Sequence, residues 1–147
     1  MKYTQLPVMG ERDWFNHTVK SLQEAGLQVT LEEPNQDFVL LNGATFNPEH
    51  KENNLHVYRA VFSDGQHQMQ IVGGSGYIHH QAGEFAIKLP FMIGMASAIS
   101  GYIDNSAYHG IVELASDGYT VHVKSYDHAI TESDDWLSFV IFSPYLK

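Results

Sequence analysis

The sequence contains no cysteine among its 147 residues. Disulfide bonds, a thiolate nucleophile and zinc sites with cysteine ligands are therefore excluded. The absence also removes the usual sign of a secreted protein, and residues 1–14 lack the apolar core and cleavage site of a secretory signal. We expect a soluble, cytoplasmic protein.

Long apolar runs are also missing. A membrane-spanning helix needs roughly 20 consecutive apolar residues. The longest candidate, residues 89–103, is shorter than this and is interrupted by glycines and serines. We therefore expect no interaction with a membrane.

Basic residues are few. Eight Lys and Arg stand against seventeen Asp and Glu, which gives a formal net charge of −9 at pH 7. The basic residues are scattered singly along the chain, whereas direct nucleic-acid binding usually needs a cluster of them that displaces counterions from phosphates. The charge therefore disfavours a nucleic-acid partner and favours a basic protein partner.

The remaining composition is typical of one folded domain. Hydrophobic residues make up 44% of the chain, and no low-complexity run or linker divides it. A chain of this length buries roughly two thirds of the surface that it exposes when unfolded. We expect a single domain over residues 1–147.

The apolar pattern predicts a helix followed by short strands. Residues 11–25 carry an apolar stripe with helical spacing, and Gly26 ends it. The stripe consists of Trp14, Phe15, Val19 and Leu22. Alternating apolar residues predict strands at 27–31, 38–41, 44–46 and 85–89, with a turn at 33–35 and a hairpin turn at Asn42–Gly43.

Two further hairpins follow from Asp-Gly turns, one at Asp64–Gly65 and one at Asp117–Gly118. In each, the turn places apolar side chains on one face of the hairpin, so turn chemistry and apolar pattern agree. The predicted pairs are Phe62 with His67 and Ala60 with Met69 at the first turn, and Leu114 with Val121 and Glu113 with His122 at the second.

Two later segments favour helices. Residues 91–103 carry Met92, Met95 and Ile99 on a helical stripe. Residues 132–142 follow Thr131, which resembles an N-cap before an acidic first turn, although alternating apolar residues there would also suit a strand. We predict an α+β fold in which a mostly antiparallel sheet of about 6–8 short strands carries two or three helices on one face.

The stretch GGSGYIHHQAGE, Gly73–Glu84, combines glycines, adjacent histidines and a carboxylate. No helical pattern follows the glycines, so we expect a bulge or wide turn between strands rather than a phosphate-binding loop. The histidines raise the alternative of a divalent metal cofactor held by two imidazoles and a carboxylate. Its candidate ligands are His79, His80, Glu84, His67 and His122. Neighbouring strand residues point to opposite faces, so His79 and His80 are not both expected to reach one ion.

Carboxylates gather in three places that could steer a cationic partner. They are Glu32, Glu33 and Asp37; Glu49 and Glu52; and Asp127, Glu132, Asp134 and Asp135. Immunity proteins against nucleases and chaperones of secreted effectors have this size and charge, which is an analogy between classes and not a motif.

We therefore predict a small acidic module, without catalytic residues or a cofactor, that binds a basic protein as an inhibitor or chaperone does. The alternative is a small metal-dependent enzyme or ligand-binding protein that uses the histidines. A third hypothesis is a structural subunit that assembles through an exposed sheet edge, for example as a homodimer.

Overall fold

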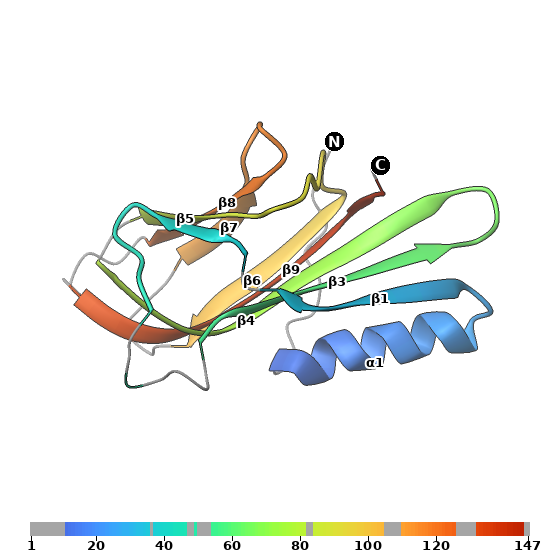
Figure 1. Ribbon diagram of the computed structural model, residues 1–147, viewed down its shortest axis with the longest axis horizontal. Coiled ribbons are helices and arrows are strands. Elements are labelled where there is room, and N and C mark those ends of the chain that lie inside the picture. The colour runs from blue at the N-terminus through green and yellow to red at the C-terminus, as the bar shows by residue number, and fades with distance from the viewer. Residues whose placement is uncertain are drawn as a thin grey trace.

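The computed structural model describes residues 11–35, 37–46, 49, 54–81, 84–104, 110–125 and 132–145. These residues form two antiparallel β-sheets and one α-helix (Figure 1). The strands of sheet A, in spatial order, are β1 (Gln28–Asn35), β3 (His56–Ser63), β4 (Gln68–Gln81), β9 (Glu132–Pro144) and β6 (Ala98–Asp104). Those of sheet B are β2 (Val39–Leu41), β5 (Glu84–Lys88), β8 (Thr120–Ser125) and β7 (Gly110–Leu114).

Side chains from the two sheets meet in the main core. Phe85 and Val121 of sheet B pack in one cluster with Val72 and Phe139 of sheet A, and none of the four is more than 1% exposed. Burial of each such side chain contributes roughly 1.5–3 kcal/mol. Packing between the sheets is therefore what holds them together.

The helix α1 (Glu11–Glu24) covers part of the opposite face of sheet A (Figure 1). Val19, which is 5% exposed, packs in a second cluster with Tyr58 of β3 and Ile71 of β4. The helix predicted over residues 11–25 is thus confirmed. It gives way to a turn at Gly26, whose φ of +89° lies in the left-handed region that glycine adopts without strain.

The glycine-rich part of β4 is a continuous strand, so the predicted bulge or wide turn is wrong. Its pairing with β9 runs without a shift from Met69 to Gln81. The glycines serve close packing instead, because a Cβ at Gly74 would collide with the Phe139 ring and one at Gly76 with the backbone of Leu55.

The predicted α+β class with two or three helices is also wrong, because the fold is mostly antiparallel sheet with the single helix α1 in the described residues. Residues 98–103 of the predicted second helix lie in strand β6, and residues 91–97 have no helical turn. Gly94 adopts a φ of +77° there, and Gly101 lies so close to Val112 that a Cβ would collide with it. Gly94 thus suits the segment that crosses between the sheets, and Gly101 suits a strand packed closely against sheet B.

The predicted C-terminal helix is replaced by β9. Leu137 and Phe139 face sheet B, while Val140 and Phe142 pack in the cluster beneath α1. Leu137, Phe139 and Ile141 are the alternating set that also suits a strand, but apolar residues on the other face as well make the pattern compatible with a helix. The acidic start of the segment belongs to an extended strand and not to a helix N-terminus.

The two Asp-Gly turns differ in outcome. At Asp117–Gly118 the register is as predicted, with Leu114 opposite Val121 and Glu113 opposite His122. At Asp64–Gly65 the pairing is shifted by two residues, so that Phe62 lies opposite Met69 and not His67.

The cause of the shift is the Asp64 side chain. Its Oδ1 accepts hydrogen bonds from the backbone N–H groups of Gln66 and His67, at 2.9 and 2.7 Å. These bonds hold a longer loop than the two-residue turn that the sequence predicted. A shift of two residues keeps the paired side chains on their predicted face, whereas His67 now lies in the loop.

The turn at Asn42–Gly43 has the expected backbone, with φ of +59° and +88°, but it does not close a hairpin. β2 pairs with β5, and Thr45 pairs with His79 of β4. The chain thus passes from sheet B to sheet A at this turn. The turn predicted at 33–35 is wrong as well, because β1 continues to Asn35 through an irregularity in its register.

Among the described residues, no helix has the length and apolar character needed to cross a membrane.

Candidate functional site

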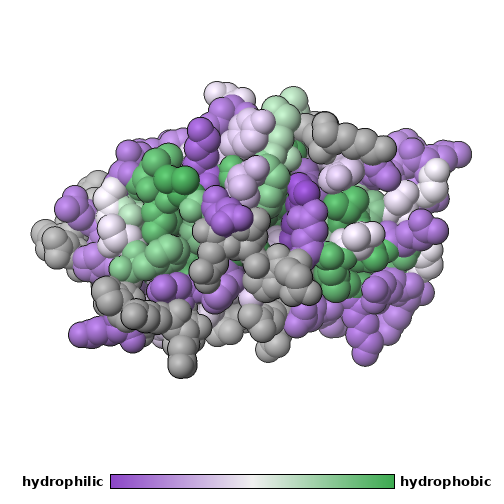
Figure 2. Space-filling model, in the orientation of Figure 1, coloured by the Kyte–Doolittle hydropathy of each residue, from purple (hydrophilic) through white to green (hydrophobic). Residues whose placement is uncertain are grey.

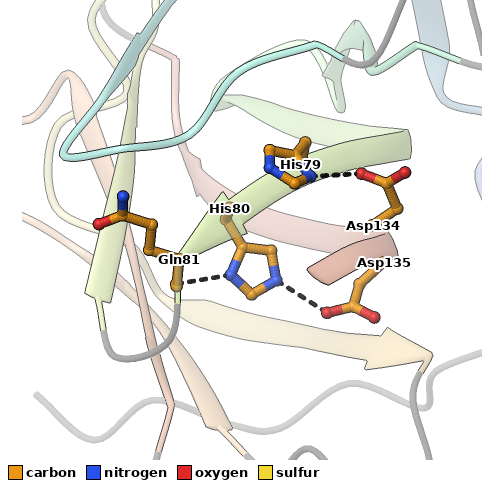
Figure 3. Close-up of polar contacts among 5 residues, drawn as sticks. All are labelled: His79, His80, Gln81, Asp134 and Asp135. Atoms are coloured by element: carbon orange, nitrogen blue, oxygen red, sulfur yellow. Dashed lines mark hydrogen bonds and ion pairs between the residues drawn. The ribbon is translucent and has the colours of Figure 1, made fainter. Parts of the chain in front are cut away.

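His79 and His80 point to opposite faces of β4, as the extended backbone predicts. Figure 3 shows each ring next to a carboxylate from β9, His79 next to Asp134 and His80 next to Asp135. Two of the residues considered as metal ligands are therefore paired with two of the residues considered for partner binding. In each pair, the histidine and the aspartate are 55 positions apart in the sequence.

The outer pair joins residues that lie directly opposite each other in the β4–β9 ladder. His79 Nδ1 lies 2.6 Å from Asp134 Oδ1. The two side chains are 37% and 31% exposed. Solvent reaches this pair, so its contribution to stability is expected to be small, at about 0.2–1 kcal/mol.

The inner pair lies in the core. His80 Nε2 is 2.8 Å from Asp135 Oδ2, and the two side chains are only 1% and 4% exposed. The second ring nitrogen, Nδ1, lies 2.8 Å from the carbonyl oxygen of Gln81, and the ring packs beside Phe85 with 4.8 Å between centroids. Both ring nitrogens therefore face oxygen atoms, and the pair connects β4, β9 and β5.

The other two histidines of the metal hypothesis lie elsewhere. His122 Nδ1 is 3.1 Å from Glu84 Oε1 on sheet B, and His67 Nδ1 is 3.5 Å from Asp64 Oδ2 at the tip of the β3–β4 hairpin. The structure distributes the predicted ligands over four separate pairs. Within the described ranges, no group of three or more His, Asp or Glu side chains is placed to hold a metal ion.

The predicted partner-binding carboxylates are also not one patch. Glu32 accepts two hydrogen bonds from Arg59, at 2.8 and 2.7 Å, in a bidentate ion pair. Asp37 and Glu49 are exposed. Glu33 and Glu132 lie in β1 and β9, but their side chains are outside what the structure describes, and Glu52 and Asp127 lie outside the described residues altogether.

Sheet B offers a different charged surface, which the sequence patterns did not single out. Phe85, Ile87, Val121 and Val123 face the core, so the residues that alternate with them form the outer face of the sheet. The charged residues of this outer face are Glu84, Lys88, Glu113 and Lys124, together with His122. Lys124 Nζ lies 3.3 Å from Glu113 Oε2.

An open pocket of about 530 Å³ lies at one end of this sheet. We call it the sheet B pocket. It is lined by Asp37, Val39, Lys88, Leu89, Pro90, Asp117 and Tyr119. These residues come from β2 and the segment before it, from the end of β5, and from the β7–β8 turn. Figure 2 shows apolar side chains gathered over β2 with hydrophilic ones around them, and Val39 of β2 is 54% exposed.

Asp117 is held firmly in this pocket by its own turn. Its Oδ2 accepts a hydrogen bond from the Thr120 hydroxyl at 2.7 Å, and its Oδ1 accepts from the backbone N–H groups of Tyr119 and Thr120, at 2.8 and 2.9 Å. The Thr120 hydroxyl and the Tyr119 N–H, followed by the Thr120 N–H and the charge of Lys88, lower the pKa of Asp117. The carboxylate therefore stays ionised at neutral pH. The Asp-Gly turn was the available sequence signal for this residue.

Comparison with known protein families, with characterised proteins and with solved structures finds no match to this chain.

Proposed function

We propose that the chain is an acidic binding module that attaches to a basic partner protein through the outer face of sheet B, as an inhibitor or chaperone would. One observation carries the proposal. The outer face and the adjoining pocket carry four carboxylates against two lysines: Asp37, Glu84, Glu113 and Asp117 against Lys88 and Lys124.

The physical basis is electrostatic attraction over the whole face. Glu84 and Glu113 have side chains that are 47% and 50% exposed, so a partner can reach them. Exposed charges act over roughly 8 Å at physiological ionic strength. A face with excess negative charge on a chain of net charge −9 attracts a cationic surface and speeds its encounter.

The test is capture of basic proteins from a lysate of the native host on the immobilised chain, followed by elution with salt. The decisive variant is the charge reversal Glu113→Lys. The matched control reverses Glu24, an exposed residue at the end of α1. Thermal unfolding checks that each variant is folded.

We expect the wild type and the Glu24→Lys variant to retain the same basic protein, released as salt rises, and the sheet B variant to lose it. Equal loss in both variants would show attraction by net charge alone and would remove the role of sheet B. A captured protein that is acidic, or that salt does not release, would contradict the proposal as a whole.

A further inference from the structure

We propose that the sheet B pocket receives an arginine side chain of the basic partner. This inference rests on the proposed function and adds the chemistry of the contact. A pocket of about 530 Å³ lies within the range of roughly 300–1,000 Å³ that is typical of binding sites. The pocket combines apolar walls with charges, and that combination identifies the occupant.

The apolar walls suit the stem of a long basic side chain. Val39 and Pro90 are exposed at the surface, whereas Leu89 is only 2% exposed. Arginine and lysine carry apolar methylene groups that pack on such surfaces while the charged end stays near solvent. A fully polar ligand would leave these walls without a partner.

The charges of the pocket select a cation. Asp37 and Asp117 approach it from two different elements, and Lys88 offsets one of the two negative charges. Carboxylate oxygens can each accept more than one hydrogen bond, so Asp117 retains acceptor capacity beyond the bonds of its own turn. An anionic ligand would meet a net negative lining.

Tyr119 favours arginine over lysine. A planar guanidinium can lie on an aromatic ring and bind a carboxylate through two parallel hydrogen bonds, whereas an ammonium acts as a point charge. The structure uses the same arrangement internally. Arg59 binds Glu32 through two hydrogen bonds and lies over the Phe91 ring, with 4.3 Å between its Cζ atom and the ring centroid.

Lys88 makes the inference testable in two directions. Its ammonium occupies the same lining as the two carboxylates and competes with an incoming cation. Removing a carboxylate should therefore weaken binding, and removing Lys88 should strengthen it. Attraction by the general charge of the face would not depend on which carboxylate is removed.

The experiment is an NMR titration of the isotopically labelled chain with N-acetyl-argininamide. The citrulline analogue, which has nearly the same shape and no charge, is the control ligand. We expect saturable shifts at the backbone amides of Asp37, Val39, Lys88, Leu89 and Tyr119 with the arginine compound only. Equal shifts with the citrulline compound, or shifts spread evenly over the molecule, would overturn the inference.

Three variants complete the test. Asp37→Asn should weaken binding about two- to fivefold, the range of one exposed ion pair. Lys88→Gln should strengthen it by a similar factor, and Glu24→Gln, at the exposed end of α1 and outside the pocket lining, should change it little. Equal effects of Asp37→Asn and Glu24→Gln would contradict the role of the pocket and leave the proposed function standing. If the sheet B charge-reversal variant instead retained the basic partner as the wild type does, that result would contradict the proposed function.

Discussion

Removing Asp135 should destabilise the protein far more than removing its neighbour Asp134. The Asp135→Ala change leaves His80 in the core without its carboxylate partner, and both side chains of that pair are at most 4% exposed. Loss of one member of a buried hydrogen-bonded pair costs roughly 1–3 kcal/mol, and more where one partner is charged, because the buried imidazole loses an acceptor that water cannot replace. Asp134→Ala breaks a pair that is about a third exposed and should cost at most about 1 kcal/mol.

The assay is urea unfolding, in which the free energy is extrapolated linearly to zero denaturant. Double-mutant cycles then isolate the coupling within each pair. For His80→Ala with Asp135→Ala we expect a coupling energy of about 2 kcal/mol or more, and for His79→Ala with Asp134→Ala about 1 kcal/mol or less. The residue types and strands are the same in both cycles, so burial is the main difference. Equal coupling in the two cycles would refute this reasoning.

Three further predictions concern other contacts. Gly74→Ala should cost about 1–3 kcal/mol of unfolding free energy because its Cβ collides with the Phe139 ring, and Phe139→Leu in the same chain should recover part of that loss in urea unfolding. Asp117 has a lowered pKa, so its charge contributes stability above the unfolded pKa of about 3.9, and this contribution is lost as the pH falls through the folded pKa. Asp117→Asn should therefore lower the free energy of unfolding at neutral pH, and the values for variant and wild type should converge in strong acid. A difference in unfolding free energy that is the same at every pH would show that the charge of Asp117 is not its cause. Arg59→Lys should cost about 1 kcal/mol, because a lysine cannot replace the bidentate contact with Glu32, and a Tm equal to that of the wild type would contradict this.

The sequence predicts local structure well where one pattern dominates. The stripe through Val19 and Leu22 predicts α1, and the turn at Asp117–Gly118 predicts the β7–β8 register residue by residue. Both features depend on residues close together in the chain. The shifted hairpin at Asp64 shows the limit, since one side chain that binds the loop backbone changes the register.

The two wrong helices share a physical cause. Each segment is a strand of sheet A whose pairing partner lies far away in the sequence, and apolar residues such as Phe139 and Phe142 occupy opposite faces of β9. A strand with apolar residues on both faces retains some alternation, but not enough to separate it from a helix. Its identity depends on pairing with β4, which lies about half the chain away.

The candidate site was less predictable than the fold. The sequence shows that His80 and Asp135 are titratable, but not that the ladder between β4 and β9 places them within 2.8 Å of each other in the core. The sheet B pocket likewise joins Asp37 to Asp117, which come from different parts of the chain. Of the two, only Asp37 belonged to a predicted acidic patch.

The central claim is that the outer face of sheet B binds a cationic partner by charge. The most direct measurement is the Kd of the captured partner as a function of salt, for the wild type and for Glu84→Gln with Glu113→Gln. We predict that Kd rises steeply with salt for the wild type and that the variant binds more weakly at low salt with a shallower dependence. A Kd that is independent of salt, or unchanged in the variant, would contradict the account.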